Sequence, residues 1–261
     1  MTTPFTSLQR GLVRVLPAGV VYPLTEWRHG HQEPELRQLA ALAPTGRVSV
    51  DVGAWMGPWT RALSRRSTHV HAFEPQPGLA AFLRGVVASN VTVHEAAVGA
   101  TKGTATLVTD DRPGRDALAR LGQDTVEGID PAHRVEREVD VVALDDLGLD
   151  DVGFVKIDVE GHELEPLAGA ARLLGGQRPT VVLEAEQRHI DHPISDVFAA
   201  VLSHGYHGWF LFDRRWLPLD RFDVTAHQLA LVDTPTAASY VNNFVFTVAA
   251  EPPGAGAAPR R

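Results

Sequence analysis

Short apolar runs alternate with helix-like segments along most of the chain, and this alternation is the feature that most restricts its fold. Such a repeat produces right-handed crossovers between parallel strands, with helices covering both faces of one sheet. In sheets of this kind ligands bind beyond the carboxyl ends of the strands. The predicted strands are 47–52, 70–73, 91–94, 154–157, 180–183, 209–212 and 244–248, the predicted helices are 59–66, 79–88, 163–174 and 197–203, and 103–108 with 138–144 form an added pair.

Composition limits the class of partner. The 261 residues are 44% hydrophobic, which is enough for one large α/β domain or two small ones. The formal charge of −8, with acids and bases interspersed, argues against a nucleic acid or an anionic membrane as partner. No apolar run approaches 18 residues, so no membrane span is predicted. The absence of cysteine excludes disulfides and thiolate metal sites, and with no clean signal pattern we expect a cytoplasmic protein.

The first predicted strand ends in the stretch DVGAWMGPWT, where an acid precedes two glycines. Gly53 and Gly57 allow a tight turn and a close approach of a ligand to the backbone, and Pro58 suits the first turn of the following helix. The G-x-x-x-G spacing is not the G-x-G-x-x-G of dinucleotide-binding proteins, which disfavours a nicotinamide-dependent reductase. Asp51 at the turn disfavours a phosphate and favours a cation or an amine.

The second predicted strand also ends in an acid, Glu74, which lies 23 residues after Asp51. A carboxylate at this position accepts both hydroxyl groups of a ribose. S-adenosylmethionine has a ribose and an ammonium group and lacks phosphate, so it meets all of these demands. The alternative interpretation is an ordinary strand-to-helix turn in which Asp51 caps the helix.

Five segments, in chain order, resemble the FkbM family of S-adenosylmethionine-dependent methyltransferases. They are DVGAWMGPWT, HAFEPQP, VTVHEAAVG, VVALDDL and FVKIDVEGHELEPLAGA, and the resemblance runs from about residue 47 to about residue 186. It implies a class I methyltransferase fold, α/β and Rossmann-like, with a seven-stranded, mostly parallel sheet whose last strand is antiparallel. It also implies O-methylation of a hydroxyl group on a small natural product or a sugar.

The resemblance implies roles for individual residues around the cofactor. The turn residues Asp51, Gly53, Ala54 and Gly57 would hold the methionine part of S-adenosylmethionine, and Glu74 would hold the ribose. Gln76 and the turn at Glu95 and Ala96 would lie beside the adenine, although Glu95 stands where an amide is usual.

A second group of ionisable residues follows the predicted strand 154–157. The stretch IDVEGHE places Asp158, Glu160, His162 and Glu163 within six residues, an arrangement that is costly unless these groups are solvated, paired or used. An alcohol becomes a good nucleophile only when its proton leaves, so methyl transfer to oxygen needs a base. We predict His162 as that base, because histidine titrates near neutrality. The alternative is a solvent-facing residue at a helix N-terminus.

Asp158 has two candidate roles. It is predicted as a catalytic and cofactor-binding residue, contacting the methionine ammonium group or the acceptor hydroxyl. Alternatively, Asp158 with Glu184 or Glu186 forms an oxygen site for Mg²⁺, or these carboxylates simply bond to the backbone. Lys156 is predicted as an ion-pair anchor, because a buried lysine is seldom unpaired.

Other polar residues near the predicted strand ends have weaker signals. Asp145 is predicted to cap a turn. His189 and His192 either line a substrate mouth, ligate a metal or are solvated loop residues.

The predicted methyltransferase domain spans 46–250. Residues 1–45 form an N-terminal extension that acts as a cap or as an oligomer interface, a homodimer being one option, and 251–261 form a disordered tail. The segments 109–137 and 213–240 are predicted insertions that cover a small hydroxylated acceptor. The alternative to an enzyme is a non-catalytic scaffold that binds S-adenosylmethionine.

Overall fold

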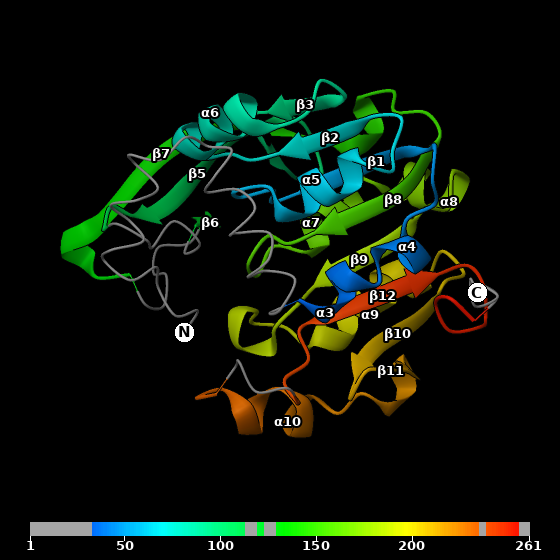
Figure 1. The fold of residues 1–261 in the computed structure, drawn as a ribbon. Helices are drawn as coiled ribbons and strands as arrows, with labels where there is room; N and C mark the ends of the chain where they lie inside the picture. Colours follow the sequence, from blue (N-terminus) through cyan, green and yellow to red (C-terminus); the bar gives the residue numbers. More distant parts are fainter. Residues whose placement is uncertain (1–32, 113–118, 123–128, 235–238, 256–261) are drawn as a thin grey trace.

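The computed structural model describes residues 33–112, 119–122, 129–234 and 239–255. Within them one large sheet crosses the molecule with helices on both sides, and a smaller sheet extends from one end (Figure 1). The large sheet has the order β11-β10-β12-β9-β8-β1-β2-β3. Its strands are β1 (Val48–Val52), β2 (Val70–Phe73), β3 (Val91–His94), β8 (Val152–Ile157), β9 (Thr180–Glu184), β10 (His207–Phe212), β11 (Arg215–Pro218) and β12 (Asn243–Thr247).

The large sheet is mostly parallel, as predicted. Strands β3, β2, β1, β8 and β9 run parallel, while the last strand, β12, lies antiparallel between β9 and β10. The seven predicted strands are therefore confirmed, and their ends agree with the structure to within a few residues. The carboxyl ends of β1, β2, β8 and β9 meet at one edge of this sheet, so residues distant in sequence come together there.

An eighth strand, β11, joins the edge of the large sheet, and the sequence did not suggest it. It pairs with β10 in a hairpin whose two turn residues, Asp213 and Arg214, have φ angles of 46° and 62°. Two successive positive φ angles give a turn whose twist matches that of a hairpin. The first residues of the segment 213–240 are therefore part of the sheet and not of an insertion.

The predicted added pair is the centre of a second sheet with the order β4-β7-β5-β6. Its strands are β4 (Ala97–Val98), β5 (Gly103–Asp110), β6 (Arg120–Leu121) and β7 (Arg134–Val142). β5 and β7 pair along their length, so both are longer than predicted and include the two ends of the segment 109–137. The rest of that segment contains β6 and residues outside the described ranges.

Helices cover the two faces of the large sheet in two groups. The first group, α3 to α6, lies over the face that carries Phe154 and Val245, and the second group, α7 to α9, lies over the face that carries Val155 and Phe244. The helices are α3 (Pro34–Arg37), α4 (Leu39–Leu42), α5 (Pro58–Ser64), α6 (Pro77–Val86), α7 (Leu164–Ala168), α8 (Ala171–Gly176), α9 (Ile194–Leu202) and α10 (Val224–His227). Short 3₁₀ turns are Pro131–His133, Leu144–Asp146, Gln187–His189, Leu219–Arg221 and Leu229–Leu231.

The predicted helix 163–174 is two helices, α7 and α8, with a break at Gly169. The Asp145 amide donates to the Gly169 carbonyl, and the Asp145 carboxylate accepts from the amides of Arg172 and Leu173. Asp145 therefore caps the start of α8, a helix distant in sequence, and not the turn at the end of the added pair that it was predicted to cap. A Cβ at Gly169 would lie 2.0 Å from the Gly99 carbonyl oxygen, so the break also lets two backbones touch.

The described part of the predicted N-terminal extension belongs to the core. Leu36, Leu39 and Leu42 of α3 and α4 are buried against Trp59 and Phe154. Residues 34–43 are therefore continuous with the methyltransferase domain, and the part of the predicted extension in 1–32 lies outside the described ranges. At the other end, 251–255 are described, and a Cβ at Gly254 would lie 3.2 Å from that of Ala41. In the described residues no helix combines the length and the apolar character needed to cross a bilayer.

Candidate functional site

The turn after β1 has the backbone geometry that the two glycines predict. Gly53 and Gly57 have φ angles of +77° and +80°, and Gly57 is the residue before α5. A Cβ at Gly53 would lie 1.8 Å from the carbonyl oxygen of Asp158, so only glycine fits there. The Gly53 and Ala54 amides donate to the Phe73 carbonyl, while the Asp158 amide donates to the Val52 carbonyl. Backbone hydrogen bonds therefore join the carboxyl ends of β1, β2 and β8.

Asp51 is a buried carboxylate that faces α5. Its Oδ2 accepts a hydrogen bond of 2.5 Å from Thr60 Oγ1, nine residues later on α5. Burial raises the pKa of Asp51 to about 6, against the opposing effects of Thr60 and Lys156. Asp51 also pairs in register with Lys156 on β8, so an ammonium group and a carboxylate stand side by side on one face of the sheet.

Glu74 follows β2 and binds the turn after β1. Its Oε2 accepts from the Trp55 amide at 2.9 Å, and its Oε1 accepts from the Gln76 amide at 2.8 Å. These two backbone donors fix the orientation of the carboxylate. Trp55 has a φ of 47°, a conformation that points its amide at Glu74. The structure thus brings the residues predicted to bind the methionine part and the ribose to adjacent strand ends.

The residues predicted to lie beside an adenine are at the neighbouring strand end. Gln76 precedes α6, and Glu95 and Ala96 follow β3. The Glu95 carboxylate pairs with Arg84 of α6 at 2.8 Å, and both side chains are exposed. Ala96 is buried. The side chain of Glu95 is thus directed to α6, while the backbone of the Glu95–Ala96 turn remains next to β2.

Lys156 lies at the centre of a buried ionic group. Its side chain is 1% exposed, and its Nζ lies 3.5 Å from Asp158 Oδ2 and 3.7 Å from Glu184 Oε2. Nζ also donates to Asn243 Oδ1 at 3.3 Å and lies 5.7 Å from the centroid of the Trp59 ring. Burial lowers the pKa of Lys156, but Asp158 and Glu184 outweigh it and raise the pKa above its ordinary value. The predicted role of Lys156 as an ion-pair anchor is confirmed.

The two carboxylates beside Lys156 are crowded. Burial raises the pKa of Asp158, and burial together with the Asp158 charge raises the pKa of Glu184 well above its ordinary range. One ammonium group therefore does not neutralise the negative charge of this edge. Glu184 Oε1 also accepts from the Asn242 amide group at 2.7 Å.

This edge does not fit Mg²⁺. The Lys156 ammonium group lies between Asp158 and Glu184, where the metal would need to bind. Glu186, the third candidate ligand, accepts from Arg188 Nε at 2.6 Å and from the Tyr240 hydroxyl, and so has its own partners. In the described ranges no three His, Asp or Glu side chains come together in a metal-binding arrangement.

His162 lies just before α7, and its ring is largely buried. Nδ1 is 3.9 Å from Glu165 Oε2, while Nε2 is buried and has no hydrogen-bond partner among the described residues. A buried ring nitrogen without a partner is costly, so this atom is a candidate for contact with a ligand. The solvent-facing alternative for His162 does not hold.

Glu163, which the sequence analysis left without a role, is more deeply buried. Its Oε1 accepts from the Gly161 amide at 2.7 Å, and its Oε2 has no partner within the described part of the chain. Burial raises the pKa of Glu163 to about 7. Its position next to His162 adds a second ionisable group at the same strand end.

Glu160 and His189 form a further pair that the sequence left open. His189 Nδ1 lies 2.7 Å from Glu160 Oε2, and the ring is only 15% exposed, so His189 is not a solvated loop residue. Burial acts to raise the pKa of Glu160, but the His189 hydrogen bond and the charges of Arg120 and Arg188 lower it overall. Arg120 comes from β6, so the second sheet reaches this side of the site.

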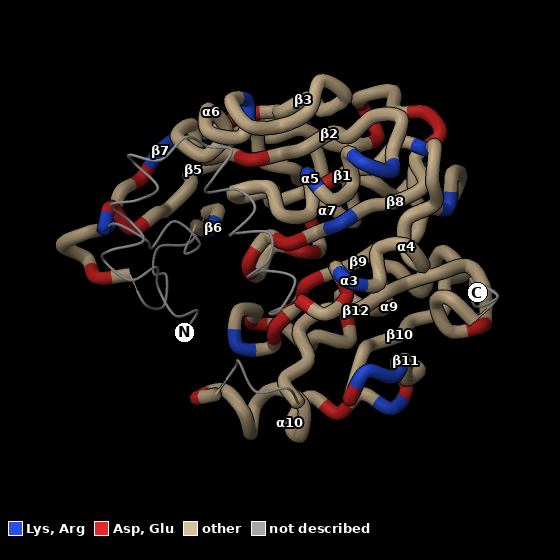
Figure 2. The backbone as a smooth tube through the Cα atoms, in the orientation of Figure 1, with Lys and Arg blue, Asp and Glu red and all other residues tan. Residues whose placement is uncertain are grey.

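Sequence patterns missed the acidic residues that α3 brings to the site. Glu33 accepts a hydrogen bond from Trp59 Nε1, and Glu35 is 4% exposed. Figure 2 shows acidic stretches gathering where β8, β9 and α3 approach each other, with basic stretches on β8 and on α3. Neither glutamate follows a strand, so no strand-end pattern signals them.

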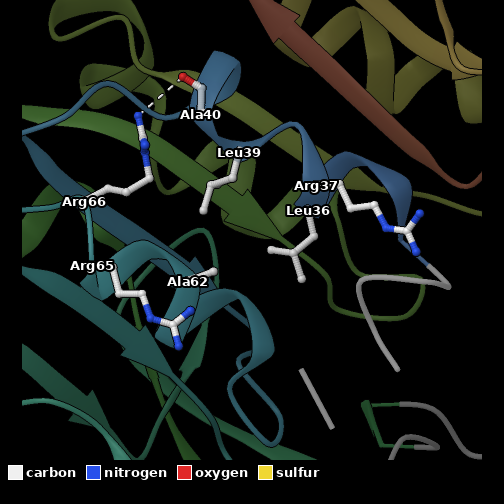
Figure 3. A pocket seen from close by; sticks show the side chains of 7 residues that line it. All are labelled: Leu36, Arg37, Leu39, Ala40, Ala62, Arg65 and Arg66. Atoms are coloured by element: carbon white, nitrogen blue, oxygen red, sulfur yellow. Dashed lines mark hydrogen bonds between the residues drawn. The ribbon is translucent and has the colours of Figure 1, made fainter. Parts of the chain in front are cut away.

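A pocket of about 480 Å³ lies away from this edge, between α3, α4 and α5 (Figure 3). It is open to solvent, and it contains none of the buried carboxylates. Arg66 at its rim donates to the carbonyl of Ala40. The pocket is therefore not the candidate active site. Its lining consists of Leu36, Arg37, Leu39, Ala40, Ala62, Arg65 and Arg66.

The strand order, the antiparallel β12 and the glycine turn at β1 define a class I S-adenosylmethionine-dependent methyltransferase. Within that class the chain belongs to the FkbM methyltransferase family, since the family model for the methyltransferase FkbM domain matches residues 51–207. The family in turn implies S-adenosylmethionine as cofactor. No curated protein matches the chain in a sequence comparison.

Solved structures with a similar fold include a methyltransferase FkbM from Methylobacillus flagellatus KT. It is 20% identical with a TM-score of 0.50, over 77% of this chain and 43% of that one, so this chain corresponds to less than half of that protein. A precorrin-6y C5,15-methyltransferase from Geobacter metallireducens GS-15 is 19% identical with a TM-score of 0.40, over 82% and 84% of the two chains. A TehB-like SAM-dependent methyltransferase from Corynebacterium glutamicum is 13% identical with a TM-score of 0.43, over 88% and 98%.

Proposed function

We propose that this protein transfers a methyl group from S-adenosylmethionine to a hydroxyl group of a small natural product or a sugar. The observation that carries the proposal is the buried, unpartnered Nε2 of His162, which lies a few residues after β8 at the ligand-binding edge of the sheet. A base there is required for transfer to an alcohol oxygen and not for transfer to a nucleophile that is already deprotonated.

The residues at this edge fit S-adenosylmethionine. The cofactor brings a positive sulfonium and an ammonium group to a place where buried carboxylates outnumber the single ammonium group of Lys156. In our proposal Asp51 and the backbone of Gly53, Ala54 and Gly57 hold the methionine part, with Asp158 close to its ammonium group. The carboxylate of Glu74, which the amides of Trp55 and Gln76 orient, suits the two ribose hydroxyl groups, because hydroxyl groups donate to carboxylate oxygens.

The adenine would lie against Gln76, Ala96 and the backbone at Glu95 in this proposal. The Arg84 pair turns the Glu95 carboxylate to α6, which is consistent with a backbone contact to the adenine and not a side-chain contact. When bound, the cofactor supplies an electrophilic methyl carbon on its sulfonium.

The protein's own residues handle the proton of the acceptor. The acceptor oxygen forms a bond to the methyl carbon as the carbon–sulfur bond breaks, and the hydroxyl proton passes to His162 Nε2. The products are a methyl ether, neutral S-adenosylhomocysteine and a protonated imidazole that returns its proton to water. Asp158, as the second catalytic residue, orients the hydroxyl and favours the positive charge that develops on His162. Both belong to the same strand end, which keeps their spacing fixed.

The acceptor is proposed to be a small hydroxylated molecule bound next to the second sheet. Glu160, His189 and Arg120 supply polar groups from three elements on that side, which suits the recognition of a polyol or a glycoside. The segment 109–137, which leads into β6 and back to β7, is the proposed specificity element.

The proposal is tested with purified protein, S-adenosylmethionine that carries a labelled methyl group, and a panel of sugars and hydroxylated polyketides. Formation of a methyl ether on one of these classes, together with S-adenosylhomocysteine, supports the proposal. Tight binding of S-adenosylmethionine without transfer to any acceptor of the panel would favour a scaffold. Exchange of residues 109–137 for those of a relative is expected to change the preferred acceptor, and an unchanged preference would remove this segment from the proposal.

A further inference from the structure

The segment before β1 contributes acidic residues to the cofactor edge, although it lies outside the residues 51–207 that define the family domain. The apolar side chains of α3 and α4 are buried against Trp59, Leu63 and Phe154, which seats this segment firmly on the sheet face that carries Lys156. Glu33 immediately precedes α3, and Glu35 is in its first turn. Both glutamates are therefore held in place by the core.

Glu33 takes part in the buried ionic group around Lys156. It accepts a hydrogen bond from Trp59 Nε1, and the Trp59 ring stacks on Phe154 with centroids 6.0 Å apart. The same ring lies 5.7 Å from the Lys156 ammonium nitrogen. The Glu33 charge acts on Asp51, Asp158 and Glu184, which places it within electrostatic reach of all three.

Glu35 is the least satisfied of these carboxylates. It is 4% exposed, and its Oε2 is buried without a hydrogen-bond partner among the described residues. Burial raises its pKa to about 7; the Glu33 charge adds to this effect, and the Lys156 charge opposes it. A buried carboxylate oxygen without a donor indicates that a donor or a cation is missing.

The charges of this cluster do not balance. Within the described ranges the charge of one ammonium group, that of Lys156, acts on four buried carboxylates, Asp51, Asp158, Glu184 and Glu35, and the pKa of each of the four is nevertheless raised. Such a cluster gains a positive ligand or takes up protons. S-adenosylmethionine has a net charge of +1, from its sulfonium and ammonium groups and its carboxylate, whereas S-adenosylhomocysteine is neutral overall.

We propose that Glu35, supported by Glu33, is a charge-selective residue of the cofactor pocket, which makes the protein bind S-adenosylmethionine more tightly than S-adenosylhomocysteine. This inference rests on the proposed use of S-adenosylmethionine, and it adds a residue from outside the family domain. Loss of the sulfonium charge in methyl transfer weakens the attraction of the cluster, so the product leaves more readily than the substrate. Binding of the cation also displaces protons that the cluster otherwise retains near neutral pH.

The test is calorimetry of the full chain with S-adenosylmethionine and with S-adenosylhomocysteine, for the wild type, Glu35→Gln and the control Glu138→Gln, an exposed glutamate on β7. We expect Glu35→Gln to weaken binding of S-adenosylmethionine about 5- to 10-fold and that of S-adenosylhomocysteine less than about 2-fold. In buffers of different ionisation enthalpy at pH 7, the wild type should release protons when it binds S-adenosylmethionine, and Glu35→Gln should release fewer. Glu138→Gln should behave as the wild type does.

Equal weakening for the two ligands, or none for either, would overturn the inference and leave the proposed function intact. If the wild type binds neither ligand at millimolar concentration, the proposed function itself fails. Thermal unfolding without ligand separates a folding defect from a binding effect. Because Gln cannot ionise, Glu35→Gln should unfold at a higher temperature than the wild type at pH 8, whereas a structural defect would lower that temperature.

Discussion

Gly53 and the carbonyl group of Asp158 touch, since a Cβ atom on Gly53 would lie 1.8 Å from the Asp158 oxygen. Gly53 begins the turn after β1, and Asp158 follows β8, the parallel neighbour of β1. The contact joins the glycine turn and the ionic group of Lys156 into one rigid edge. A displacement of either strand tip would therefore change both halves of the candidate site.

Gly53→Ala should be strongly destabilising. The added Cβ meets backbone that cannot rotate away, and the φ of +77° is itself unfavourable for alanine, so we expect a loss of about 3 kcal/mol or more in the free energy of unfolding. Gly46→Ala is the matched control, since Gly46 has a φ of +80° and nothing within 4 Å of an added Cβ. That variant should lose only about 1 kcal/mol. Urea denaturation measures both, and similar losses would contradict the contact.

The site residues at the strand ends of the family domain could be predicted, because each of them stands in a local sequence pattern. Asp51 lies near the end of the apolar strand β1, and Gly53, Gly57 and Glu74 follow apolar strands. A parallel sheet places such strand ends at one edge. The structure bears out this convergence. Lys156 could also be predicted as paired, because a lysine in an apolar strand has few alternatives.

The remaining site residues have no local signal. Thr60 donates to Asp51 from α5. Glu33 and Glu35 lie just before and within α3, a short helix that packs on the sheet through apolar residues too few to give a recognisable helical period. Their roles depend on tertiary packing, which neither spacing nor periodicity encodes. β11 was missed for a similar reason, because its turn residues, Asp213 and Arg214, are not the usual Asn-Gly or Asp-Gly.

Glu163→Gln should stabilise the ligand-free protein at alkaline pH. The pKa of Glu163 is raised from 4.5 to about 7, so the folded state binds a proton that the unfolded state has lost between these values. Wild-type stability therefore decreases as pH rises through this range, and Gln removes that decrease. We expect a gain of about 1–3 kcal/mol at pH 8 and none at pH 4.5. Urea denaturation at several pH values measures the free energy of unfolding, with Glu138→Gln as control. A gain that does not depend on pH would show that ionisation of Glu163 is not its cause.

Lys156→Met should be destabilising, and more so at alkaline pH. The change leaves Asp158 and Glu184 buried without their ammonium partner, which costs about 3–5 kcal/mol. Lower pH should reduce the loss, because both carboxylates become neutral by taking up protons. Lys102→Met is the matched control, since Lys102 is exposed and is the only other lysine of the chain. Thermal unfolding from pH 5 to pH 9 measures both, and an equal loss at all pH values would show that charge is not the cause.

Methyl transfer should not depend on a divalent metal ion. The Lys156 ammonium group lies between the two carboxylates that would bind Mg²⁺, and Glu186 is held by Arg188 and Tyr240. After dialysis against EDTA we expect the rate of methyl transfer to remain within about 2-fold of the untreated rate. This change is much smaller than the loss of rate that removal of a catalytic group causes. A rate that falls with EDTA and returns with Mg²⁺ would show that the ionic group rearranges to admit a metal.

His162→Asn should reduce kcat by about 10²- to 10⁴-fold, the range for loss of a general base. The binding of S-adenosylmethionine should change little, because His162 acts on the proton of the acceptor and not on the cofactor. The pH–rate profiles of the wild type and the variant should differ in shape, a difference that a purely structural role would not produce. His207→Asn is the control, since His207 is exposed and is the first residue of β10. An unchanged kcat in His162→Asn would remove this residue from the chemistry, and Glu163, with its buried and unpartnered oxygen, would become the candidate base.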